Sequence, residues 1–158
     1  MYNNKGKKMQ EKKILLASDH GGVALKNHLR DWLKAQSYQV VDCGCQPDES
    51  VDYPDFALAL VRQMQADENA RGILVCTTGI GMSIMANRFD FIRGALVQNT
   101  DMAKMCRAHN DANVLIFGAK YMDEKTAQEC VDLFLNTPFE GGRHARRVNK
   151  LNCSGGQK

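Results

Sequence analysis

The sequence predicts an α/β protein: a single Rossmann-like domain in which a five-stranded parallel sheet carries helices on both faces. Three observations lead to this prediction. Five short aliphatic runs are bounded by turn residues, stretches with apolar residues at helical spacing lie between them, and the connections are short. Such alternation of strand and helix favours a parallel sheet covered by helices. At 158 residues, the chain has the size of one domain.

Each predicted element follows from a local pattern of apolar residues. Apolar side chains at helical spacing predict helices over 25–33, 56–64 and 127–135. Pro54 suits the start of the second helix, and Asp123 is an N-cap candidate for the third. The aliphatic and β-branched runs between the helices predict buried strands over 14–18, 39–41, 72–76, 94–98 and 114–117.

Composition and charge bound the class of protein. The formal net charge of +3 is too small to predict nucleic-acid binding, and the surplus lies in the N-terminal tail and near 143–150. No apolar run approaches the roughly 18–20 residues that cross a bilayer, so we expect no membrane partner. We predict a disordered N-terminal extension at 1–12, one folded domain at 13–152 and a flexible tail at 153–158.

The cysteines favour a reducing compartment. Six cysteines would suit a disulfide framework in a secreted protein, but no apolar signal-peptide core follows the basic N-terminal segment. Cys76, Cys106 and Cys130 fall inside apolar or helical patterns, where a thiol usually behaves as a small hydrophobe. Cys43 and Cys45 form a pair without the second pair that a zinc site needs. We therefore expect a cytoplasmic location and no bound metal.

Polar segments at the ends of strands are the candidates for function, because ligands of parallel α/β sheets bind beyond the carboxyl ends of the strands. The first predicted strand leads into the polar segment 18–22, and the third leads into 76–81. Another polar segment, 109–111, comes just before the last strand, and 141–147 lies near the C-terminus. We expect the chemistry to reside in these four segments.

The loop CTTGIG at 76–81 has the form of an anion-binding turn. A strand, a glycine-containing turn and a helix start at 82–87 leave backbone N–H groups and the positive end of the helix dipole near the strand end. Nucleotide motifs fail, because Ile84 occupies the third glycine position of the dinucleotide fingerprint and no Gly-Lys-Ser/Thr follows. A cysteine phosphatase would need an arginine where the chain continues with GMS. The loop could therefore bind a small anion, or it could be a turn that only reverses the chain.

Side chains in these segments are suited to acid–base and phosphate chemistry. Cys76, at a helix N-terminus, could act as a nucleophile or general base, although taken alone it is better explained as packing. His109, at a helix end, is either an acid–base group or a capping residue. Arg143 and Arg147 share one helical face, so they could clamp a phosphate or form part of a solvated charged surface.

The order of these motifs is similar to that of a known family. The segments ASDHGG, DYPDFA, GILVCTTGIGMSIMAN, HNDANVL and FEGGRHARRV together resemble the B type of ribose-5-phosphate isomerase, in a family that includes allose-6-phosphate and galactose-6-phosphate isomerases. The resemblance covers the chain from about Lys13 to Leu151. It implies that the domain at 13–152 interconverts ribose 5-phosphate and ribulose 5-phosphate through an enediolate. It also implies a homodimer or homotetramer with sites between subunits, and neither cofactor nor metal.

The resemblance implies a role for each matching position. Cys76 matches the base that takes the proton from C2 of the open-chain sugar, and His109, with Thr78 nearby, matches the group that assists ring opening. The backbone N–H groups from Thr77 to Gly81 would stabilise the enediolate. The positions that match contacts to the sugar or its phosphate are Asp19, His20, Tyr53, Thr77, Gly79, Ile80, Gly81, Asn110, Lys120, Arg143 and Arg147.

Two positions depart from the family pattern. The usual glycine after the cysteine is Thr77, whose Cβ would intrude on the substrate and limit positive φ. Lys120 stands where many relatives have arginine, and a lysine lacks the bidentate fork. A second family branch uses a glutamate base at the position of Met82, which leaves that role to Cys76 here. Three functions stay open: a ribose-5-phosphate isomerase, an allose- or galactose-6-phosphate isomerase, and a catalytically silent sugar-phosphate-binding protein.

Overall fold

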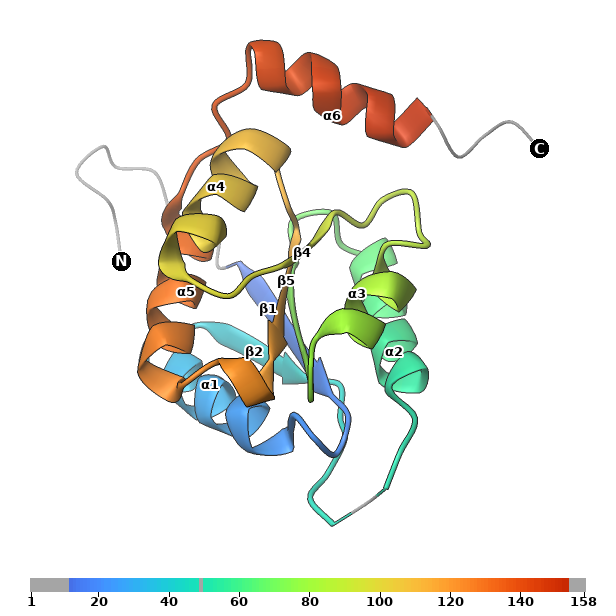
Figure 1. The fold of residues 1–158 in the computed structure, drawn as a ribbon, viewed down its shortest axis with the longest axis vertical. Helices are drawn as coiled ribbons and strands as arrows, with labels where there is room; N and C mark the ends of the chain where they lie inside the picture. The colour runs from blue at the N-terminus through green and yellow to red at the C-terminus, as the bar shows by residue number, and fades with distance from the viewer. Residues whose placement is uncertain (1–11, 49, 154–158) are drawn as a thin grey trace.

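The computed structural model describes residues 12–48 and 50–153, and Figure 1 shows its fold. Most of the predicted N-terminal extension and tail lies outside the described residues. Of these two segments, Lys12 is described, and its ammonium donates to the carbonyl oxygen of Leu135 at 3.1 Å. Cys153 is described as the last residue of the final helix.

Five parallel strands form one sheet in the order β2-β1-β3-β5-β4, which confirms the predicted sheet. The edge strand β4 is shorter than the predicted 94–98. It ends before Asn99, because the side chain of this residue accepts from the Met102 N–H and caps the following helix. The strands are β1 (Lys13–Ser18), β2 (Gln39–Asp42), β3 (Arg71–Cys76), β4 (Gly94–Leu96) and β5 (Val114–Gly118).

Helices cover both faces of the sheet, as predicted (Figure 1). One core lies between the sheet and the helices α1 (Val23–Ala35), α4 (Thr100–Asn110) and α5 (Glu124–Asn136). A second core lies between the opposite face and the helices α2 (Tyr53–Gln65) and α3 (Ile80–Ala86). The central strands β1, β3 and β5 are buried on both sides, which explains their continuous aliphatic sequences.

Two elements, η1 and α6, do not belong to the two helical layers that cover the sheet. The 3₁₀ helix η1 (Ala119–Tyr121) follows β5 directly. Helix α6 (Arg143–Cys153) lies beyond the amino-terminal edge of the sheet, next to α4 (Figure 1). Within residues 12–48 and 50–153, no helix is long and apolar enough to span a membrane.

The direction of chain winding changes between β1 and β3. The chain continues from β1 to β2 on one side, and from β3 to the pair β5 and β4 on the other. In open parallel sheets this switch point is where ligands bind, beyond the carboxyl ends of the strands. The loops after β1, β3 and β5 meet there. The Asp19 N–H donates to the Val75 carbonyl at 3.3 Å, and the Lys120 N–H donates to the Thr77 carbonyl at 3.0 Å.

Candidate active site

Cys76 is the last residue of β3, and only 4% of its surface is exposed. The N–H of Gly79 donates to its sulfur at 3.1 Å, because the loop folds back over the strand end. One residue further on, the N–H of Ile80 donates to the Thr78 hydroxyl oxygen at 3.3 Å. The thiol therefore lies inside a turn that holds a backbone donor against it, as expected for a loop at a helix start.

Gly79 makes this turn possible. Its φ of +77° is in the left-handed region, which glycine adopts without cost. A Cβ at this position would lie 3.0 Å from the backbone nitrogen of Gly118 and 3.0 Å from the carbonyl carbon of Phe117. The left-handed turn also starts α3 at Ile80, two residues before the predicted helix start.

The loop after β1 packs against the cysteine loop. Asp19 is buried, with 8% of its surface exposed, and its carboxylate accepts from the Gly22 N–H at 3.1 Å. A Cβ on Gly21 would collide with the side chain of Thr77, so these two positions are in direct apposition. His20 is exposed, and its Nδ1 lies 3.2 Å from the backbone of Val51.

Tyr53 and Lys120 complete a first group of predicted residues. A Cβ on Gly81 would lie 2.6 Å from Cζ of Tyr53, which places the phenol ring over the start of α3. Lys120, in η1, is tied to the cysteine loop through its backbone bond to Thr77. We call this set the cysteine group; it consists of Asp19, His20, Tyr53, Cys76, Thr77, Thr78, Gly79, Ile80, Gly81 and Lys120.

Thr77 fits its position with an ordinary backbone. Among the described residues, the non-glycine positions with positive φ are Ser37, Asp48 and Asp111. The expected conflict between Thr77 and a left-handed backbone therefore does not arise. What the threonine adds is an exposed side chain beside Gly21, at the front of the cysteine group.

The remaining predicted residues form a second group around the end of α4. His109, Asn110 and Arg147 line a hollow of about 320 Å³, together with residues of α6. Arg143 lies one turn before Arg147 on the same helix, and both side chains are exposed. We call His109, Asn110, Arg143 and Arg147 the histidine group.

The two groups lie at opposite ends of the parallel strands, the cysteine group at the carboxyl ends and the histidine group at the amino ends. Cys76 is paired with Gly118 at the carboxyl end of β5, whereas His109 precedes Val114, the first residue of that strand. Four residue steps along β5 amount to about 13 Å at the usual rise of a strand. Within one chain, the structure therefore does not bring Cys76 together with His109 and the arginines.

An ion-pair network fixes the end of α4. Asp111 adopts φ +48° directly after the helix, and its carboxylate accepts from Arg107 at 2.8 Å and from Arg93 at 3.1 Å. Arg107 is 94% buried and also donates to the carbonyl of Ala112. His109 and Asn110 therefore project from a firmly anchored helix end.

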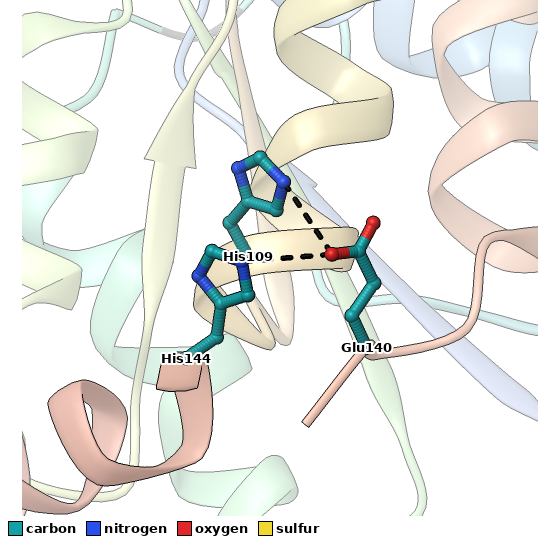
Figure 2. A group of neighbouring side chains, drawn as sticks. All are labelled: His109, Glu140 and His144. Carbon is teal, nitrogen blue, oxygen red and sulfur yellow. Dashed lines mark ion pairs between the residues drawn. The ribbon is translucent and has the colours of Figure 1, made fainter. Parts of the chain in front are cut away.

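Sequence reasoning missed two partners of His109, namely Glu140 and His144. The imidazole of His144 stacks on that of His109, with ring centroids 4.2 Å apart and an interplanar angle of 8°. The Glu140 Oε2 atom lies 3.7 Å from Nε2 of His109 and 3.5 Å from Nε2 of His144 (Figure 2). Burial, and then the neighbouring His109 and Arg143, lower the pKa of His144. The available signal was the Glu-x-x-x-His spacing of 140 and 144.

Comparison with known proteins decides the family. A family model described as Ribose/Galactose Isomerase matches residues 14–151. The chain belongs to this family. The match confirms the resemblance drawn from the motifs, and with it the expected enzyme class, an isomerase.

Individual relatives agree with this assignment over nearly the whole chain. Ribose-5-phosphate isomerase B of Escherichia coli is 38% identical over 140 residues, covering 89% of this chain and 94% of the relative. The structure of the Anaplasma phagocytophilum enzyme shares 50% identity and a TM-score of 0.85, with 92% and 99% of the chains covered. The Mycoplasma genitalium enzyme, solved with bound ribulose-5-phosphate, shares 36% identity and a TM-score of 0.88, with 92% and 97% covered.

Proposed function

We propose that this protein interconverts ribose 5-phosphate and ribulose 5-phosphate, with Cys76 as the base that moves the proton. The observation that carries the proposal is the placement of the Cys76 sulfur at the switch point of the sheet, under the Gly79 N–H at 3.1 Å. A member of the same family with a TM-score of 0.88 holds ribulose-5-phosphate. Both facts support a sugar-phosphate substrate at the cysteine group.

The reaction needs one base and a way to hold negative charge. The thiolate of Cys76 would take the proton from C2 of the open-chain aldose, and the electron pair of that C–H bond would form the enediolate. The same sulfur would return the proton to C1 while the hydroxyl proton moves from O2 to O1, which gives the ketose. A single base can serve both carbons if the enediolate stays planar.

Backbone donors of the loop would hold the enediolate oxygens. Of the N–H groups from Thr77 to Gly81, that of Gly79 points at the Cys76 sulfur and that of Ile80 points at the Thr78 hydroxyl. In these positions the Gly79 N–H would stabilise the Cys76 thiolate, and the Ile80 N–H would have to exchange the Thr78 hydroxyl for an enediolate oxygen when substrate binds. The Asp19 carboxylate and the His20 and Tyr53 side chains, with Lys120 behind the loop, would contact the sugar.

We further propose that the complete site forms between two copies of the chain. His109 would assist ring opening by protonating the ring oxygen, Asn110 would contact the sugar, and Arg143 and Arg147 would clamp the phosphate. These residues lie at the opposite edge of the sheet from Cys76, so a second subunit must supply them. The partner would belong to a homodimer or a homotetramer.

Exposed apolar side chains beside both groups support this assembly. Ile80 and Ile84 on α3 are 54% and 63% exposed, next to the cysteine loop. Leu151 on α6 is 59% exposed and lines the hollow beside His109. Covering such side chains is favourable by about 25 cal/mol per Å² of apolar surface. Light scattering on the full chain at micromolar concentration should therefore give at least twice the mass of the 17.6 kDa chain.

The test of the base is a coupled assay of ribose 5-phosphate turnover by the wild type and by Cys76→Ala. General-base catalysis is worth about 10²–10⁴-fold, so the variant should lose that much in kcat. Cys106→Ala, which removes a buried thiol from α4, is the matched control and should keep its activity. Comparable turnover by the wild type and Cys76→Ala would remove Cys76 from the role of base.

A substrate panel separates the remaining alternatives. Ribose, allose and galactose phosphates compared at equal concentration should show the highest kcat/KM for ribose 5-phosphate, and a preference for a hexose phosphate would reassign the substrate. The exposed side chain of Thr77 is the specific reason to test for a silent binding protein. The silent binding protein would be favoured if the wild type binds sugar phosphate without turning it over and Thr77→Gly gains turnover.

The proposal includes a reducing, cytoplasmic location. Cys43, Cys45, Cys76, Cys106 and Cys130 are free thiols. Catalysis by a thiolate also requires that the sulfur of Cys76 stay reduced. Activity that is lost on mild oxidation and recovered with dithiothreitol would agree with this placement.

A further inference from the structure

We propose that His109, Glu140 and His144 form a binding site for one divalent transition-metal ion of the Zn²⁺ type. The three side chains come from the end of α4, the segment before α6 and the first turn of α6 (Figure 2). Their nearest ligand atoms all lie within 4.8 Å of one another. Two imidazoles and one carboxylate are a ligand set that zinc uses in proteins, with the fourth position left to water.

The spacing of the atoms suits a tetrahedral ion. Zinc binds nitrogen and carboxylate oxygen at about 2.1 Å, which separates neighbouring ligand atoms of a tetrahedron by about 3.4 Å. Glu140 Oε2 lies 3.5 Å from Nε2 of His144 and 3.7 Å from Nε2 of His109. These separations are too long for hydrogen bonds and match the edge of the tetrahedron.

His144 supplies a second, independent observation. Its side chain is only 9% exposed, and its Nε2 is a buried side-chain atom without a hydrogen-bond partner within the described ranges. Buried polar atoms in native proteins are nearly always satisfied, and Glu140 Oε2 at 3.5 Å is too far away to form a good hydrogen bond with this nitrogen, so its position calls for an explanation. A metal ion between the two rings and the carboxylate would satisfy it.

The ligand types indicate which ion the site would take. Nitrogen ligands select zinc, nickel or cobalt over magnesium and calcium, which prefer oxygen.

One adjustment is needed, because stacked rings cannot both point at one ion. The ring of His109, with 38% of its side chain exposed, faces the hollow lined by α6 and has room to tilt off the stack. The ion would then occupy the lone pair with which His109 is proposed to handle the ring-opening proton. A bound ion would therefore inhibit the isomerase reaction. This inhibition rests on the proposed function, whereas binding of the metal does not.

The experiment measures Zn²⁺ binding to the full chain without substrate, by competition with a chromophoric chelator. We expect one ion per chain, with affinity at least about tenfold lower in Glu140→Gln and in His144→Phe, since even indirect changes at metal sites cost that much. Glu140 is exposed, so its variant keeps the test valid if His144→Phe does not fold. Glu124→Gln removes the carboxylate 3.3 Å from His28 and is the matched control.

A cysteine site is the competing explanation, and Cys76→Ser distinguishes it. Unchanged affinity in Cys76→Ser and Glu124→Gln, with weakened binding in the two site variants, supports the proposal. Binding that is equal in Glu140→Gln, His144→Phe and wild type, or lost in Cys76→Ser, overturns it. If the protein fails to turn over ribose 5-phosphate, the proposed function falls while this binding result stands.

Discussion

Lys26 offers a stringent test of how the fold is held around the switch point. This residue of α1 has no exposed surface, and its ammonium donates to both carboxylate oxygens of Asp42 at 2.7 and 2.8 Å. It also donates to the carbonyl of Cys45 at 3.0 Å. We expect Lys26→Met, which keeps an unbranched side chain one atom shorter and without the charge, to lower the free energy of unfolding markedly.

The magnitude follows from what Asp42 retains. Breaking a buried ion pair on one side costs about 3–5 kcal/mol, because the other charge is left buried. Asp42 is 18% exposed and keeps the Gly44 N–H at 2.9 Å and the Arg30 guanidinium at 3.1 Å. We therefore expect about 3 kcal/mol, at the lower end of that range. For a domain of this size, this corresponds to a fall in Tm of about 6–12 °C.

The pH dependence of stability should change in a defined direction. Burial alone would raise the pKa of Asp42, but hydrogen bonds from Lys26, Gly44 and Arg30 outweigh it and hold the pKa below its usual value. A carboxyl with a lowered folded pKa stabilises the fold above its unfolded pKa of about 3.9, and this contribution is lost as pH falls through the folded pKa. Lys26→Met removes the leading stabilising bond, so the loss of stability on acidification below about pH 4 should become smaller.

The assay is thermal and urea unfolding followed by circular dichroism between acid and neutral pH. Lys34→Met, an exposed lysine on the same helix, is the matched control and should leave Tm nearly unchanged. The reasoning is refuted if Lys26→Met lowers Tm no more than Lys34→Met does.

Two further predictions concern the cysteine loop and the buried thiols. Gly79→Ala should lower Tm and abolish turnover, because a left-handed alanine costs about 1–2 kcal/mol and its Cβ would press on the backbone of Gly118. Gly141 is the matched control, because its φ is +67° and a Cβ there would meet no atom within 4 Å. Gly141→Ala should therefore show the backbone cost alone. An equal fall in Tm in the two variants would contradict the predicted clash at Gly79. Burial raises the pKa of Cys106 and Cys130 to about 11, so both thiols stay protonated at pH 8 and should escape iodoacetamide until urea is added. Mass spectrometry measures the labelling, and rapid modification of either thiol in the native protein would contradict the prediction.

Much of the fold could be predicted from local patterns. The aliphatic runs of β1, β3 and β5 are continuous because these strands are buried on both faces, and this makes them easy to recognise. Asp123 was correctly expected to cap α5, since its side chain accepts from the Thr126 N–H at 2.9 Å. Boundaries were harder: β4 ends at Leu96 because Asn99 begins the next helix, which depends on a cap rather than on hydropathy.

The site was only half predictable. The rule that ligands bind beyond carboxyl strand ends correctly gathers the segments after β1, β3 and β5. His109 precedes a strand instead, so in one chain it lies at the opposite edge, and the sequence contains no direct sign of the partner subunit. Glu140 and His144 were missed because their proximity to His109 arises from the return of the chain after α5. The Lys26–Asp42 pair was missed because a buried lysine cannot be told from a solvated one by helical spacing alone.

The claim that each site is shared by two chains can be tested by mixing inactive variants. Cys76→Ala and His109→Asn each remove one group, so each homodimer should be inactive. After dissociation and reassembly of an equal mixture, heterodimers contain one intact site, and about a quarter of the wild-type activity should return. The double variant Cys76→Ala/His109→Asn mixed with wild type should lower activity below that of the wild-type chains present. Heterodimers that form without any return of activity in the first mixture would contradict a site built from both chains.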